Sequence, residues 1–236
     1  MCRSISGYGL PNGDLLISDV TDSHSEMVLE FGLDDSSLPP KSFPIECRPK
    51  NGCNMEDYLK PEEYKIYYRG KRPDWVTKQM LESWRSKFRL YLRDHLVLED
   101  RNALMGGRWI IGKAKVQLLR NCYIPVVAGG TLMNFRSSLL ADFRGGTLGH
   151  FQDSTLEHFW NGTVKHFWGN KLDDFYNGTI ENFWGGRLVD FRRGTLVDFW
   201  NGRIEVLHPG ATIINWRGGS IGKTRRGATI ENDLRG

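Results

Sequence analysis

The chain has 236 residues, a net charge of +4 and 39% apolar residues, a balance typical of one or two folded domains. Its apolar runs fall short of the ~18 to 20 residues of a membrane span, and its first residues lack the apolar core of a signal peptide. Its four cysteines are too few and too irregularly spaced for a disulfide framework or a paired-cysteine zinc site. These features favour a cytosolic protein with reduced thiols and no membrane partner.

Residues 1–112 carry no repeat and mix helix and strand signals. Pro11-Asn12-Gly13-Asp14 lies between two short apolar runs and predicts a hairpin. Ser23 with Glu26 forms the pattern of a capping box, and Gly32 is placed to end the short helix that this box opens. The further elements expected here are strands at 43–48 and 64–68 and a long helix at 74–95. We therefore predict a small α+β domain over 1–112, which caps the structure that follows.

From Gly129 to His208 the sequence divides without gaps into ten units of eight residues. The fourth position of every unit is aliphatic, from Leu132 to Ile204. The seventh position is Phe in nine units and Leu207 in the last. These two positions are the expected core.

Alternate units differ, which sets the true period. The odd units carry Gly and Thr at positions two and three in every case, from Gly130-Thr131 to Gly194-Thr195, and the even units do not. One coil is therefore sixteen residues with two short strands and two turns. This predicts a mainly β fold, a parallel β-solenoid whose two sheets face each other, with coils ~4.8 Å apart.

The pattern weakens at both ends, as terminal repeats do. Upstream, the four-and-seven spacing can be followed to about Lys113. Downstream, one inserted residue near Pro209 restores it as Gly210-Ala211-Thr212-Ile213. We therefore expect a solenoid domain over 113–236 with six to seven coils, the last of them degenerate and basic.

Three segments besides the octads stand out: Met1-Cys2-Arg3-Ser4-Ile5, Thr21-Asp22-Ser23-His24 and Pro73-Asp74-Trp75. Together with the octads they resemble uncharacterised proteins encoded by bacteriophages and prophages, which share a Met-Cys start and C-terminal octapeptide repeats. The resemblance covers most of the chain and implies a viral accessory factor, one that counters a bacterial defence.

Cys2 is the residue that would carry catalysis. Removal of Met1 would leave a thiol beside its own α-amino group, an arrangement similar to N-terminal nucleophile amidotransferases and to the abasic-site-linking domain whose chains begin Met-Cys-Gly. His24 could activate this thiol. Arg3 departs from the Met-Cys-Gly pattern, and no matching downstream motif follows. An enzyme is therefore the alternative reading, and an ordinary cysteine in a first strand the simpler one.

Position eight follows the inward Phe, so its side chain should point outward. This exposes one row of Trp168, Trp184 and Trp200 and a second row of Trp160 and Tyr176. Exposed aromatic side chains mark contact surfaces, although these rings could instead pack over a corner of the solenoid. Lys171, Arg187 and Arg203 form a basic row on the second face, with Asp174 and Asp190 near enough to neutralise much of it.

Other chemistry is poorly supported. His150 and His166 stack on one face, but no third strong ligand joins them, so no metal site is expected. Residues 218–224 end in Gly-Lys-Thr but are one residue short of a P-loop, and no cofactor is implied. The Thr row lacks the second parallel rank that an ice-binding face would need.

The expected function is therefore binding without catalysis, to a host protein or a small ligand, through the solenoid face or the N-terminal domain. Nucleic-acid binding is a further alternative, because residues 209–236 hold five Lys and Arg against two Asp and Glu and bases stack on aromatic rings. The last alternative is self-assembly through the aromatic face or the coil ends.

Overall fold

The structure is a computed structural model that describes the chain except residues 1–3, 34–40, 51–54 and 69. It divides into two compact units, Met1–Leu96 and Val97–Gly236. Each unit is described by itself. The division lies at 96/97, whereas the repeat pattern placed it at 112/113.

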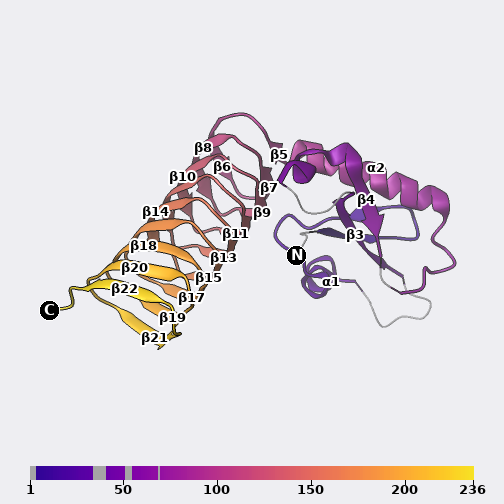
Figure 1. Cartoon of the computed structure of the whole chain (residues 1–236). Coiled ribbons are helices and arrows are strands. Elements are labelled where there is room, and N and C mark those ends of the chain that lie inside the picture. Colours follow the sequence, from indigo (N-terminus) through magenta and orange to yellow (C-terminus); the bar gives the residue numbers. More distant parts are fainter. Residues whose placement is uncertain (1–3, 34–40, 51–54, 69) are drawn as a thin grey trace. The chain divides into compact units, whose positions relative to one another are not determined.

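The first unit holds a four-stranded antiparallel sheet of order β2-β1-β3-β4. The two α-helices lie on opposite sides of this sheet (Figure 1). The elements of this unit are β1 (Ile5–Gly9), β2 (Leu15–Leu16), α1 (His24–Phe31), β3 (Phe43–Pro49), the 3-10 helices Met55–Leu59 and Pro61–Glu63, β4 (Tyr64–Tyr67) and α2 (Lys78–Asp94).

Local signals at the turns and helix ends act as expected. β1 and β2 form the hairpin around Gly13, which has a φ of 88°. Ser23 caps α1 by accepting from the Glu26 N–H, and Gly32 ends the helix with a φ of 61°. The Glu26 carboxylate, however, accepts from the hydroxyl of Thr21.

The long helix begins at Lys78, later than the expected 74. Thr77 is its N-cap and accepts from the Met80 N–H at 3.1 Å, while Val76 N–H donates to Pro73 O in a preceding turn. The apolar face of α2 packs on the sheet where β1 has glycines instead of side chains. A Cβ on Gly9 would lie 2.4 Å from the Trp84 ring, and one on Gly7 would lie 2.8 Å from the Phe88 ring.

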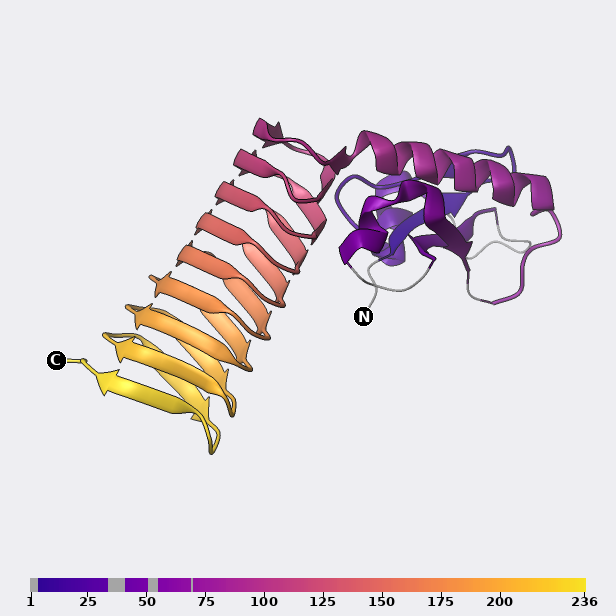
Figure 2. The same ribbon diagram turned by 45° about the horizontal axis from the view of Figure 1, so that its top comes forward.

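The second unit is the parallel β-solenoid of sixteen-residue coils (Figure 2), with nine strands in each of two sheets. We name one the threonine sheet. Its strands are β6 (Arg101–Met105), β8 (Lys115–Arg120), β10 (Thr131–Arg136), β12 (Thr147–Gln152), β14 (Thr163–Trp168), β16 (Thr179–Phe183), β18 (Gly194–Phe199), β20 (Ala211–Trp216) and β22 (Thr229–Asp233).

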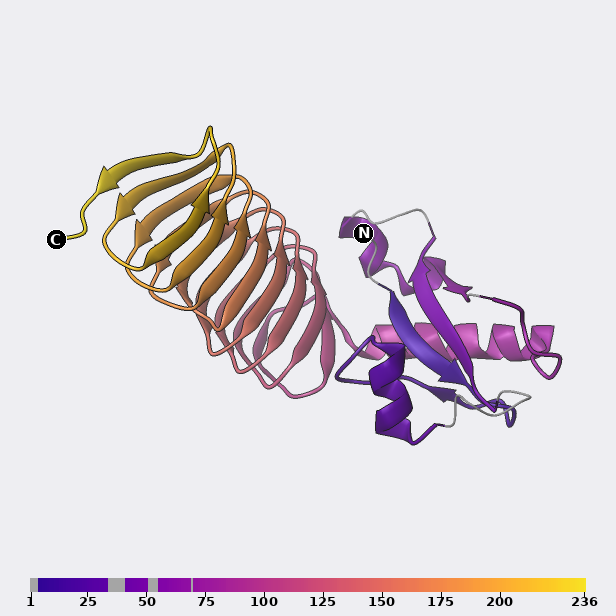
Figure 3. The same cartoon turned by 90° about the horizontal axis from the view of Figure 1, so that it is seen from below.

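We name the other the variable sheet; Figure 3 shows the two sheets as the two sides of each flattened coil. Its strands are β5 (Leu96–Val97), β7 (Arg108–Ile111), β9 (Tyr123–Val127), β11 (Leu139–Phe143), β13 (Thr155–Phe159), β15 (Lys171–Phe175), β17 (Arg187–Phe191), β19 (Arg203–Leu207) and β21 (Ser220–Thr224).

The register confirms the sixteen-residue coil. Thr131 pairs with Thr147, Thr147 with Thr163, and Phe151 with Phe167. The aliphatic and Phe positions are fully buried from Leu132 to Ile204, and neighbouring Phe rings of one sheet are about 5 Å apart, as for Phe135 and Phe151 at 5.0 Å. Each sheet therefore contributes one aliphatic row and one Phe row to the interior.

The solenoid begins before the expected Lys113 and has more than six to seven coils, because β5, β6 and β7 already belong to its sheets. The first coil is hidden from the repeat pattern for a physical reason. Arg101 pairs with Val116 and Arg108 with Tyr123, a spacing of fifteen, and an irregularity then restores sixteen between Ile110 and Val126.

Candidate functional site

Three indole rings form the tryptophan row, Trp168, Trp184 and Trp200, which lies just after the buried Phe of β14, β16 and β18. Their ring centroids are 5.9 and 4.8 Å apart, with interplanar angles of 20° and 7°. Trp168 and Trp200 are 42% and 37% exposed. The rings therefore cover one another's faces and turn their edges outward.

Both ends of the tryptophan row are closed as well. The Arg217 guanidinium lies 4.7 Å from the Trp200 ring centroid and is held by Asp198 at 2.6 Å. At the other end, the imidazoles of His150 and His166 lie 5.9 and 5.8 Å from the Trp168 ring. A cation and an imidazole pair therefore flank the two ends of the row.

The two histidines stack on each other at 4.7 Å. Burial lowers the pKa of His166 below its ordinary value of 6.5, and the neighbouring His150 lowers it further. Among the described residues no group of three His, Cys, Asp or Glu could hold a metal ion. The pair acts as aromatic surface that extends the tryptophan row.

The second aromatic row lies beside the variable sheet and is tied to its surroundings. Trp160 and Tyr176 stack at 4.2 Å, with Arg144 5.6 Å from the Trp160 ring centroid and Arg192 5.2 Å from that of Tyr176. The pKa of Arg192 is raised by its hydrogen bond to Asp174. Cations sandwich this row, and acids in turn hold the cations.

The basic row is neutralised, but by other acids than the sequence suggested. Lys171 bonds Asp173 at 2.6 Å, and Glu205 lies 2.7 Å from Arg187 and 3.8 Å from Arg203. Asp174 and Asp190 instead serve position eight: Asp174 pairs with Arg192 and His158, and Asp190 pairs with Arg192 and His208. Side chains at positions three and five share one patch, and those at six and eight share another.

Of the candidate catalytic pair, Cys2 lies outside the described residues. His24 begins α1, lies edge-on to the Tyr8 ring at 5.3 Å and places its Nε2 3.4 Å from Ile45 O. Burial raises the pKa of Cys47 to about 12, and it also raises the pKa of Cys122. These two thiols are therefore poor nucleophiles.

The C-terminal motifs become strand. Residues 220–224 form β21, where Ser220 pairs with Arg203 and Ile221 with Ile204, so the Gly-Lys-Thr sequence has no loop before a helix. Lys223, Arg225 and Arg226 are exposed. The threonine ladder is continuous and extends through Thr212 and Thr229.

Sequence reasoning missed the groups that close the aromatic rows. Arg144, Arg192 and Arg217 all occupy position eight of an eight-residue unit, one coil away from an aromatic residue at the same position, and this pattern could have been found in the sequence. For Arg217 the inserted residue near Pro209 hid the match, since Thr195 pairs with Thr212, seventeen residues on.

In the part of the chain that the structure describes, no helix has the length and apolar character to cross a membrane. No family model, curated protein or solved structure matches this chain.

Proposed function

We propose that the protein is a non-enzymatic binding protein that engages a protein partner through the tryptophan row. The observation that carries the proposal is a set of stacked indoles whose edges remain exposed at the solenoid surface. Tryptophan is enriched among the few residues that dominate binding energy in protein interfaces. Ordered rings lose little side-chain entropy when a partner covers them.

The ring geometry favours a protein over a nucleic acid. A base stacks on an open aromatic face, but rings 4.8 to 5.9 Å apart leave no room for a base between them, and Arg217 covers the end face of Trp200. The basic row is already paired with Asp173 and Glu205. Ring edges suit the apolar side chains of a protein partner.

The resemblance to phage and prophage proteins suggests where that partner is found. We place the protein in the bacterial cytosol as an accessory or anti-defence factor, and its partner among host proteins. Catalysis through Cys2 remains the alternative function, and retention of Met1 in the intact protein, measured by mass spectrometry, would exclude it.

The test is affinity purification from bacterial lysate with a variant designed from the chain's own repeat. Gln152 occupies the position of the tryptophans one coil earlier, so Trp168→Gln, Trp184→Gln and Trp200→Gln together install a residue that this position already accepts. The matched control is Lys171→Thr, Arg187→Thr and Arg203→Thr, because Thr155 holds that position on the variable sheet.

We expect a defined protein to be captured by the wild type and the control and lost from the triple-Gln variant, whose circular dichroism is unchanged. A purified complex should then show at least a tenfold weaker affinity with the variant, about 1.4 kcal/mol. Capture by all three proteins alike would reject the tryptophan row as the site. So would light scattering that shows a dimer which the triple-Gln variant abolishes, since the row would then serve self-association.

A further inference from the structure

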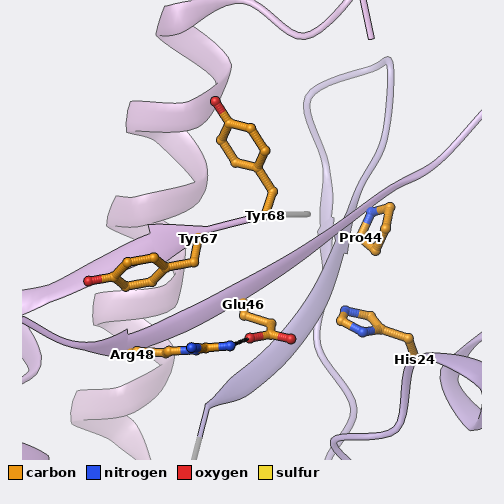
Figure 4. A pocket seen from close by; sticks show the side chains of 6 residues that line it. All are labelled: His24, Pro44, Glu46, Arg48, Tyr67 and Tyr68. Carbon is orange, nitrogen blue, oxygen red and sulfur yellow. Dashed lines mark hydrogen bonds and ion pairs between the residues drawn. The ribbon is translucent and has the colours of Figure 1, made fainter. Parts of the chain in front are cut away.

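A pocket of about 540 Å³ opens on the face of the four-stranded sheet opposite α2 (Figure 4). Successive side chains of a strand alternate between its faces. Accordingly, Cys47 of β3 is buried, whereas Pro44, Glu46 and Arg48 line the pocket. His24, Tyr67 and Tyr68 complete the lining. The volume is in the range of small-ligand sites.

Glu46 and Arg48 present an acceptor beside a donor. Their side chains form an ion pair that uses one carboxylate oxygen and one guanidinium nitrogen. The Glu46 side chain is only 15% exposed, and its second oxygen makes no hydrogen bond with the described residues. Arg48 Nε is buried and has no hydrogen-bond partner among the residues that the structure describes. A mostly buried pair with unused bonding capacity favours a ligand that completes it.

Aromatic rings flank this edge. Tyr67 pairs with Glu46 in the sheet register, and its ring centroid lies 5.4 Å from the Arg48 guanidinium. Tyr67 and Tyr68 are 40% and 41% exposed, and the Tyr68 ring packs against Phe43 at 5.2 Å. The Arg48 guanidinium covers one face of the Tyr67 ring, and the exposed remainder of that ring borders the polar edge, an arrangement that suits a flat heterocycle.

We propose that this pocket binds a guanine-type base. The N–H groups on the Watson–Crick edge of guanine are donors for the Glu46 carboxylate, and its O6 and N7 are acceptors for Arg48. The exposed part of the Tyr67 ring supplies stacking surface. Adenine offers a donor in place of O6, which would face the guanidinium, so the pocket discriminates between the two purines. This site is independent of the tryptophan row.

The experiment is calorimetric titration of the full chain with guanosine, adenosine and a short single-stranded oligonucleotide that contains one guanine. We expect guanosine to bind at least tenfold more tightly than adenosine. Glu46→Gln and Arg48→Lys should each weaken guanosine binding about tenfold or more. Lys65→Ala is the matched control, since Lys65 pairs with Arg48 in the sheet but does not line the pocket.

The titrations with guanosine and with the oligonucleotide also show whether the guanine base belongs to a free nucleoside or nucleotide or to a single strand. Equal affinity for guanosine and the oligonucleotide assigns the site to free nucleosides and nucleotides, and tighter binding of the oligonucleotide assigns it to single strands. The proposal is overturned if guanosine does not bind at millimolar concentration, if adenosine binds equally well, or if folded Glu46→Gln protein keeps the wild-type affinity. Thermal melting of each variant establishes that it is folded.

Discussion

The two sheets of the solenoid have the same interior and opposite exteriors. Both turn an aliphatic row and a Phe row inward. Outside, the threonine sheet carries a uniform Thr ladder and indoles that touch mainly one another. The variable sheet carries acids and bases that are paired within and between its coils. Architecture is thus set by the inward residues, and the outward residues are left to differentiate the surfaces.

The corners differ in the earlier coils of the solenoid. The turn into the threonine sheet uses a stack of glycines with positive φ, such as Gly162 at 113° and Gly178 at 106°. The turn into the variable sheet also uses positive-φ glycines in its later coils, Gly186, Gly202 and Gly219, but it begins with Ser137 and Asp153 in the left-handed region in its earlier coils. There the Ser138 hydroxyl donates to Arg136 O at 2.7 Å and accepts from Cys122 N–H at 2.9 Å. Close backbone contacts between glycines and hydrogen bonds between serines are therefore two ways in which the turns of successive coils stack on each other.

The largest expected effect tests the shared interior. Phe167→Ala and Phe175→Ala each remove a fully buried ring, one from each sheet, and each should lower the free energy of unfolding by about 3 to 5 kcal/mol. Urea denaturation followed by circular dichroism measures both. A difference between them larger than about 2 kcal/mol would show that the two interiors are not equivalent.

The next effect tests the corners. A Cβ on Gly178 would lie 2.4 Å from Gly162 O, and its φ of 106° is unfavourable for any side chain. Gly178→Ser should therefore cost about 2 kcal/mol or more, even though serine serves the opposite corner. Gly185→Ser is the control, because nothing lies within 4 Å of a Cβ there. Equal melting temperatures for the two variants would contradict the distinction.

A smaller effect tests the paired exterior of the variable sheet. Arg192→Ala removes the cation over Tyr176 and leaves Asp174 with one partner fewer, which should cost about 1 kcal/mol. The neighbouring Arg193 is exposed, and Arg193→Ala should change stability by less than about 0.5 kcal/mol. Chemical denaturation at low salt compares them. Equal changes in the free energy of unfolding for the two variants would show that Arg192 does not stabilise the row of Trp160 and Tyr176.

The smallest effect is the pH response of the threonine sheet. The folded pKa of His166 is depressed by burial and by His150, so the unfolded chain binds protons more tightly. Its stabilising contribution is complete above the ordinary value of 6.5 and is lost as pH falls through 6.5 toward the folded pKa. Asn182 holds the same position as His166 in the next coil, so this position accepts asparagine. The His166→Asn variant should therefore show a smaller drop in melting temperature between pH 7.5 and pH 5.5 than the wild type. If the melting temperature of the variant falls as much as that of the wild type, groups other than His166 cause the pH response.

The repeat made most of the solenoid predictable, because one spacing determines register, core and outward rows for every coil. Prediction failed where spacing changed. Coil one pairs at fifteen residues, as Arg101 does with Val116, so octads could not reveal it. The expected start of the long helix at residue 74 was wrong, because Thr77 supplies the side-chain cap and the helix begins at Lys78.

The surface chemistry was only partly predictable. The outward indoles followed from the inward Phe, but their partners did not, because pairs such as Arg217 with Asp198 join different coils. The sequence analysis also did not predict which residues of the first unit line the pocket. Pro44, Glu46 and Arg48 alternate along one strand, a pattern that marks a face without showing that α2 covers the other one.

The stacked glycine corner also bears on how such a chain changes length. Since each coil contacts mainly its two neighbours and repeats its register, a duplicated sixteen-residue segment joins the stack at about 4.8 Å per coil. Duplicating residues 169–184 would add a fourth indole to the tryptophan row without altering the interior. Recombination within the repeat can therefore lengthen or shorten the solenoid by whole coils.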